Sequence, residues 1–152
     1  MQQTTIHVLI VDDDKSDQDM LIDILDDCAS KLDISTLDDG DVVMDYLYKK
    51  GVYEHAVLPD LILLDLNMPL KDGREVLREI KTDPNTCHIP VVILSTSINK
   101  IDICDSYAHG ANAYVRKEVG LQNFMASIQH IEQFWMRTSI LPSCCNQHSE
   151  LA

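Results

Sequence analysis

The chain has 152 residues, of which 45% are hydrophobic and 24% are charged, and its formal net charge is −13. A chain of this length buries one hydrophobic core, which is typical of a single globular domain. The negative charge, with no basic stripe to offset it, excludes general binding to nucleic acids or anionic lipids. No apolar stretch is long enough to span a membrane and the amino terminus lacks the features of a secretion signal, so we expect a cytoplasmic protein without membrane contact.

Cysteine usage agrees with a reducing compartment. The five cysteines are an odd number, and none has the spacing to another cysteine or a histidine that zinc sites use. Free thiols are therefore expected. The adjacent Cys144 and Cys145 lie in a polar tail, where exposure by chance and redox control are the alternatives.

Short apolar runs alternate with amphipathic segments along the chain. Strand-like runs lie at residues 6–11, 34–37, 61–64, 91–94 and 113–116. Apolar residues recur at helical spacing after each run, within residues 20–28, 42–47, 76–80, 101–109 and 124–135. Ser16 or Asp17 is expected to cap the first helix. The alternation predicts an α/β fold with a doubly wound, five-stranded parallel sheet and helices on both faces.

The central run ends in a single carboxylate, Asp65, after four bulky aliphatic residues at 61–64. Because burying a charge inside such a run would be costly, we expect Asp65 at the end of the strand. Ligands of open α/β sheets bind beyond the carboxyl ends of the strands. Taken alone, this stretch also suits an ordinary turn whose aspartate caps a helix.

Polar residues follow the other predicted strands as well: Asp12 and Asp13 after the first, Ser95 and Thr96 after the fourth, and Lys117 after the fifth. Clustered carboxylates repel one another, and Mg²⁺, which prefers oxygen ligands, would remove that conflict. With the cation and Lys117 neutralising a phosphoryl group, Asp65 could act as its nucleophile, and Ser95 could donate a hydrogen bond to it.

Four motifs in this order resemble the response-regulator receiver domain: Val-Asp-Asp-Asp at 11–14, Asp-Leu-Asn-Met-Pro at 65–69, Ile-Leu-Ser-Thr-Ser at 93–97, and Gly-Ala-Asn-Ala-Tyr-Val-Arg-Lys at 110–117. The resemblance covers residues 5–138 and leaves 139–152 as a short polar tail. It implies a flavodoxin-like sheet with strand order 2-1-3-4-5, which agrees with the alternation of elements.

The resemblance also implies roles for the residues at the strand ends. Asp65 would be the phosphoacceptor for a histidine kinase, with Mg²⁺ held directly by Asp13, mostly through water by Asp12, and by the backbone carbonyl of Asn67. Lys117 would pair with the phosphoryl group.

Two further positions carry the family's switch. Ser95 would be the switch hydroxyl, with Thr96 in the small-residue position after it, and Tyr114 would be the aromatic residue that moves inward as Ser95 moves.

Two positions depart from the family pattern. Glu118 stands where the family commonly has proline after a cis bond, so we expect a trans bond after Lys117, because a cis bond without proline costs about 3–4 kcal/mol. Asp14 is a third acidic residue, which we interpret as a solvated charge at the start of the helix rather than a metal ligand.

The sequence also resembles the single-domain regulators of phytochrome histidine kinases in several short segments, at residues 81–85, 89–90, 94–98, 134–135 and 141–142. That implies a homodimer through the fourth helix, fifth strand and fifth helix. Phe134 and Trp135, with Tyr107 and Tyr114, could join the interface; alternatively, Phe134 and Trp135 only close the edge of the core. Because no output domain follows, we expect signalling through the receiver's own surface.

Three other functions fit part of the pattern. A phosphorelay shuttle to a histidine phosphotransfer protein would use identical site residues. A Mg²⁺-dependent phosphohydrolase is disfavoured, because Asn67 stands where that class carries a second carboxylate. A degenerate receiver acting only as a binding module is disfavoured because every site position is filled. We therefore expect a signalling protein, not an enzyme, that promotes only its own phosphorylation and dephosphorylation.

Overall fold

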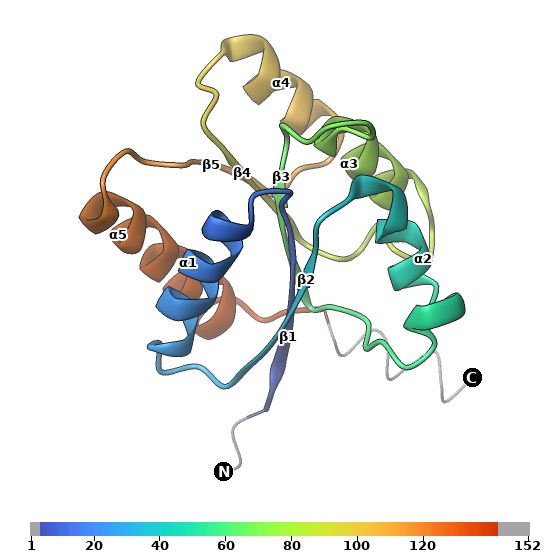
Figure 1. Ribbon diagram of the computed structural model, residues 1–152, viewed down its shortest axis with the longest axis horizontal. Coiled ribbons are helices and arrows are strands. Elements are labelled where there is room, and N and C mark those ends of the chain that lie inside the picture. The colour runs from blue at the N-terminus through green and yellow to red at the C-terminus, as the bar shows by residue number, and fades with distance from the viewer. Residues whose placement is uncertain (1–3, 143–152) are drawn as a thin grey trace.

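The computed structural model, which describes residues 4–142, contains a single five-stranded parallel sheet (Figure 1). Its strands are β1 (Ile6–Val11), β2 (Leu32–Leu37), β3 (Leu61–Asp65), β4 (Val91–Ser95) and β5 (Ala113–Arg116). Their order across the sheet is β2-β1-β3-β4-β5, and all neighbours are parallel. The predicted doubly wound α/β fold, with its flavodoxin-like strand order, is confirmed.

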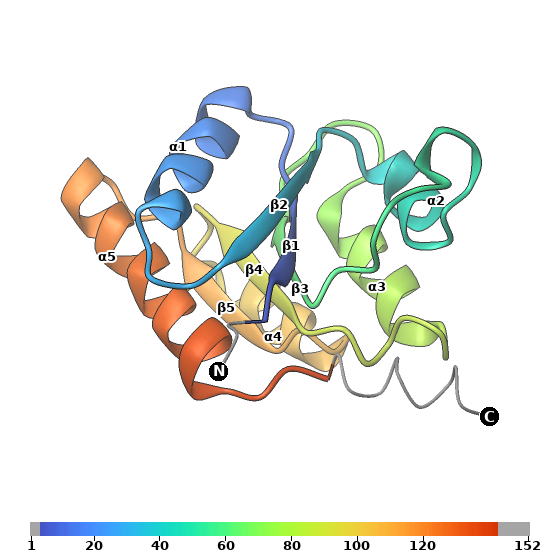
Figure 2. The ribbon, with the colours of Figure 1, turned by 90° about the horizontal axis from the view of Figure 1, so that it is seen from below.

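Helices cover both faces of this sheet. They are α1 (Lys15–Asp26), α2 (Val43–Leu47), α3 (Gly73–Thr82), α4 (Lys100–Ala108) and α5 (Leu121–Ile131). α1 and α5 lie together on one side, and α2 and α3 lie on the other (Figure 2). None of the helices within residues 4–142 combines the length and the apolar character needed to cross a bilayer.

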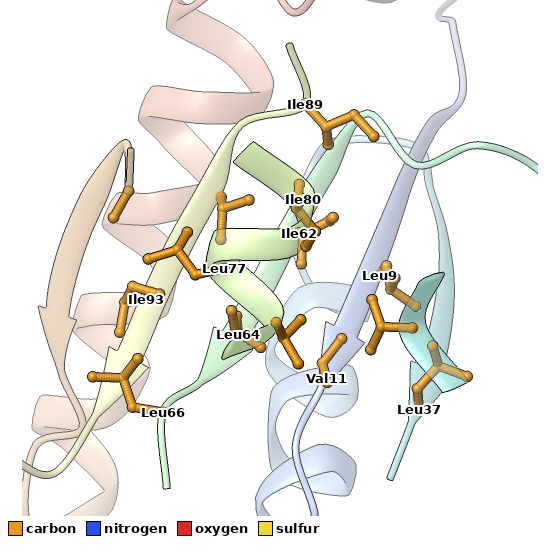
Figure 3. Packing of buried hydrophobic residues seen from close by; sticks show 14 of the residues in the cluster. Leu9, Val11, Leu37, Ile62, Leu64, Leu66, Leu77, Ile80, Ile89 and Ile93 are labelled. Carbon is orange, nitrogen blue, oxygen red and sulfur yellow. The ribbon is translucent and has the colours of Figure 1, made fainter. Parts of the chain in front are cut away.

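The central strands explain why the apolar runs show no alternation. Every residue of β3 and β4 is buried, since both faces of these strands are covered. Ile62 points into the cluster that contains Leu77 and Ile80 of α3, whereas Leu63 points into the cluster that contains Ile128 of α5. Figure 3 shows the first of these clusters between the sheet and α3. The sheet is thus packed between two cores, and polar residues follow at its carboxyl edge.

The first helix begins differently from the prediction. Asp14 is its cap, because the Asp14 carboxylate accepts hydrogen bonds from the backbone N–H groups of Ser16 (2.9 Å) and Asp17 (3.2 Å). The prediction that Ser16 or Asp17 caps the helix is therefore wrong, while Asp14 is an exposed charge at the helix start, as predicted. The cap at Asp14 leaves the Asp17 carboxylate available for a tertiary contact.

The last helix also differs from a regular amphipathic stripe. Phe124, Ile128 and Ile131 are buried as expected, but from Glu132 to Thr138 the chain continues as a π-helix. Trp135 packs against the core, whereas the side chain of Phe134 is 52% exposed. The alternative in which both rings close the core thus holds for Trp135 only.

Three of the five cysteines lie within the described residues. Cys28, Cys87 and Cys104 are free thiols, as predicted. The adjacent pair Cys144 and Cys145 lies outside the described residues, so the two alternatives for that pair stay open.

Gly73 fixes the path from β3 into α3. Its N–H group donates to the carbonyl of Leu66 (2.9 Å), and a Cβ atom here would lie 2.1 Å from the backbone oxygen of Asp65. Only glycine permits this approach without moving the strand end that carries Asp65.

Gly73→Ala should therefore lower the free energy of unfolding by about 3 kcal/mol, because the strand end or the helix must shift. Gly51→Ala is the control: nothing lies within 4 Å of its added Cβ, and its positive φ alone should cost about 1 kcal/mol. Urea denaturation followed by circular dichroism measures both. Equal losses for the two variants would contradict the proposed close approach.

Candidate functional site

The register of the strands brings the polar strand ends together at one edge of the sheet. β1 and β3 are paired so that Asp12 follows β1 next to Asp65 at the end of β3. On the other side Asp65 pairs with Leu94, so Ser95 lies one residue further along β4. The backbone oxygen of Ser95 in turn accepts a hydrogen bond from the N–H group of Lys117 (2.8 Å).

Three carboxylates gather at this edge. Asp12, Asp13 and Asp65 each offer an oxygen, and these oxygens lie within 4.8 Å of one another. Asp12 and Asp65 are 2% and 7% exposed, while Asp13 is exposed. Since hard oxygen donors at this separation, with one open side, suit an octahedral divalent cation that keeps water ligands, the residues present fit a Mg²⁺ site.

Lys117 compensates part of the negative charge. Its ammonium Nζ lies 2.8 Å from Asp12 Oδ2, 2.9 Å from Asp17 Oδ2 and 3.6 Å from Asp65 Oδ2. Burial would lower the pKa of Lys117, but the bonds to Asp12 and Asp17 and the charge of Asp65 raise the pKa above its usual value. Lys117 is therefore a permanent cation beside the Asp65 carboxylate.

The surroundings of Asp65 disfavour its charged form, whereas those of Lys117 favour the charged form. Burial outweighs the attraction of Lys117 and, together with repulsion from Asp12, raises the pKa of Asp65 to about 6. The backbone N–H group of Asn67 donates to Asp65 Oδ1 at 3.2 Å, which orients the carboxylate. Asn67 itself is exposed, and the predicted role of its backbone carbonyl as a metal ligand stays a prediction.

The two residues expected to form a switch are linked through a third. The buried Ser95 hydroxyl accepts a hydrogen bond from the N–H group of Ser97 (3.1 Å), and the Tyr114 hydroxyl donates to the carbonyl oxygen of Ser97 (2.8 Å). Thr96, between them, is exposed and lines a cavity next to Lys117. The switch role of Ser95 and Tyr114 stays a prediction, and the sequence did not indicate that Ser97 joins them, because two of its three contacts are made by its backbone and depend on the path of the loop after β4.

A second set of residues that the sequence did not reveal joins the site to α4. Arg74 donates to Asp72, the cap of α3 (2.8 Å), and to Asp102 of α4 (2.7 Å). Asp102 also accepts a hydrogen bond from the Ser97 hydroxyl (2.7 Å). The loops after β3 and β4 are thus connected by charged hydrogen bonds.

Comparison with known proteins decides the family. The model of the response regulator receiver domain matches residues 8–129. The chain belongs to this family.

Two relatives make the comparison more specific. Response regulator Rcp1 from Synechocystis sp. is 42% identical to this receiver domain over 136 residues, which are 90% of this chain and 92% of Rcp1. The crystal structure of the phosphorylated cyanobacterial phytochrome response regulator RcpA superposes with a TM-score of 0.88 and 44% identity, and the match covers 91% of this chain and 99% of RcpA.

The comparison also bears on the metal. The crystal structure of the Mn²⁺-bound form of Rcp1 has a TM-score of 0.86 and 42% identity over 90% of this chain and 99% of that one. That relative binds a divalent cation, and the acidic cluster of this receiver domain is suited to do the same.

The peptide bond after Lys117, where this chain lacks the family's usual proline, has the predicted trans form. Within residues 4–142 no peptide bond is cis, so the bond to Glu118 is trans. The carboxylate contacts of Lys117 nevertheless form, which shows that this receiver domain positions its lysine without the proline.

The raised pKa of Asp65 makes stability depend on pH. Between about pH 4 and 6 the folded protein holds a proton that the unfolded chain has released, so stability falls as pH rises through this window. Without metal, Asp65→Asn should therefore be more stable than the wild type by about 2–3 kcal/mol at pH 8, and the difference should vanish near pH 4.

Denaturant unfolding in EDTA at pH 4, 6 and 8 tests this expectation. Asp23→Asn, at an exposed position on α1, is the control for loss of one negative charge, and its effect should be small at every pH. An Asp65→Asn variant that is less stable than the wild type at pH 8 would show that Lys117 outweighs the burial of Asp65.

Proposed function

We propose that this receiver domain is a cytoplasmic two-component response regulator that accepts a phosphoryl group on Asp65 from a phytochrome-type histidine kinase. The observation that carries the proposal is the position of the Asp65 carboxylate, which belongs to an oxygen cluster suited to Mg²⁺ and lies 3.6 Å from the Lys117 ammonium. The likeness to RcpA and Rcp1 along nearly the whole chain supports the choice of kinase.

The transfer step follows from these contacts. An Asp65 oxygen attacks the phosphorus of a phosphohistidine, a new P–O bond forms, and the P–N bond breaks with its electron pair left on the imidazole. Lys117, 3.6 Å from Asp65, would bind one of the transferred oxygens as negative charge develops. Asp12, Asp13, Asp65 and the backbone carbonyl of Asn67 would hold Mg²⁺, which supplies further neutralisation of the phosphoryl charge.

Two exposed apolar side chains lie in the loops that follow β3 and β5, the strands that Asp65 ends and that Lys117 follows. Leu70, in the loop after β3, is 87% exposed, and Val119, in the loop after β5, is 83% exposed. Exposed apolar groups in the loops that follow the site strands support binding to a protein surface. A kinase domain presenting its histidine between these loops fits that requirement.

The proposed output surface is the face formed by α4, β5 and α5. Ile101 and Tyr107 on α4 are 76% and 49% exposed. Phe134, in the π-helix that continues α5, is 52% exposed. Because only Ser106 of α4 is fully buried, this helix contributes little to the core. We propose that two copies associate through this face after phosphorylation, with Ser95 and Tyr114 as the switch residues.

The phosphoacceptor proposal predicts a simple chemical result. With a phosphoramidate donor and Mg²⁺, the wild type should gain the mass of one phosphoryl group, whereas Asp65→Asn or added EDTA should abolish the gain. Lys117→Ala should slow it by about a hundredfold, because a cation that stabilises the transferring group is lost. Intact-protein mass spectrometry measures the rates, with Asp23→Asn as the control that should react like the wild type. Unchanged phosphorylation of Asp65→Asn would contradict the proposal.

Dimer formation is a separate prediction. With Mg²⁺ and beryllofluoride, which mimics an aspartyl phosphate, the wild type should double its mass in light scattering after size exclusion, and Asp65→Asn should not. Ile101→Ser and Phe134→Ser should each weaken the dimer about tenfold by removing apolar contact area.

Val52→Ser is the matched control, since Val52 is 92% exposed beyond α2, outside the proposed interface. Ser95→Ala should abolish the response to beryllofluoride while leaving the monomer folded. A dimer that Ile101→Ser and Phe134→Ser leave unchanged would exclude this face.

A further inference from the structure

The Lys117 ammonium makes two close carboxylate contacts, and only one of them is within the acidic cluster. Asp12 Oδ2 lies 2.8 Å away and Asp17 Oδ2 lies 2.9 Å away, both at hydrogen-bond distance. Asp65, the proposed acceptor, is at 3.6 Å, which is too long for a hydrogen bond. In the unphosphorylated protein the lysine is therefore bonded to Asp12 and to Asp17 of α1 rather than to Asp65, the residue it would serve.

Asp17 is placed for this contact by the start of α1. The cap falls on Asp14, so the Asp17 side chain in the first helical turn is not used by the helix. Its side chain is 30% exposed, whereas that of Lys117 is only 9% exposed. Asp17 thus attracts the lysine from the wetter side of the site.

Next to this pair lies a cavity that gives the two side chains room to separate. Asp17, Lys117, Thr96, Met20, Leu121 and Phe124 contribute to its lining, and its volume is about 280 Å³. Because Asp17 faces both this space and the solvent, it can lose the lysine and remain hydrated. Asp12, which is 2% exposed, cannot do so.

We propose that Asp17 is a positioning residue that holds the Lys117 ammonium on the α1 side of the site until a phosphoryl group on Asp65 replaces it. The inference rests on the proposed phosphoacceptor function. When phosphoryl oxygens lie beside Asp65, the lysine exchanges its bond to Asp17 for a bond to one of them. The hydrogen bond between Lys117 and Asp17 is therefore lost when the phosphoryl group binds. The free energy of that lost bond reduces the affinity for the phosphoryl group.

The test measures beryllofluoride affinity by isothermal titration calorimetry at saturating Mg²⁺. Asp17→Asn should bind about fivefold more tightly than the wild type, because the charge-assisted bond that competes for Lys117 is weakened. Asp14→Asn is the matched control: it removes the same charge from the same turn, keeps a residue that caps well, and has no hydrogen bond to Lys117. Its affinity should stay close to that of the wild type.

A second comparison separates the holding of the lysine from simple repulsion between Asp17 and the ligand. In a Lys117→Ala background, Asp17→Asn should have no effect on beryllofluoride affinity, since there is no ammonium to hold. Equal tightening in both backgrounds, or equal tightening by Asp14→Asn, would overturn the inference. So would an unchanged or weaker affinity of Asp17→Asn in an otherwise wild-type protein that binds beryllofluoride. A wild type that does not bind beryllofluoride at all would contradict the proposed function and this inference together.

Discussion

The contact between Lys117 and Asp12 is the constraint on which the rest of the site depends. Asp12 is nearly inaccessible to water and lies beside two further carboxylates, a combination that is costly without a cation. Lys117 supplies one cation from the position directly after the edge strand β5, and it reaches Asp12 across the ends of β3 and β4. The parallel sheet and its order therefore serve an electrostatic purpose, since they bring four distant chain segments to one edge.

One lysine does not balance the three carboxylates, and the remaining negative charge destabilises the ionised form of Asp65. The pKa of Asp65 is raised to about 6, which shows that its ionised form is stabilised too little by its surroundings. A carboxylate whose ionised form is poorly stabilised gains more stabilisation from a divalent cation than a solvated carboxylate would. The fold offsets the cost through the two apolar clusters on either side of β3, where burial is nearly complete.

The strand ends could be predicted from sequence because they depend on periodicity and on chain order. Asp12, Asp65 and Lys117 each follow an apolar run, so a parallel sheet must bring them together, and no side-chain geometry is needed for that inference. Other features depend on competition between near-equal alternatives. Asp14, Ser16 and Asp17 are all good helix caps, and only the path of the loop after β1 selects Asp14.

The link between the site and α4 was hidden for a different physical reason. Ser97 takes part in it through a backbone N–H group, a backbone carbonyl and a hydroxyl, which contact Ser95, Tyr114 and Asp102 in turn. A movement of the Ser95 hydroxyl toward a phosphoryl group would break its bond to the Ser97 N–H group, and the other two bonds would then have to change or strain. Asp102 is also held by Arg74, so the hydrogen bonds of Asp102 tie the loop after β4 to the first turn of α4 and to α3. This arrangement supports a two-state response rather than a gradual one, because several hydrogen bonds must exchange together.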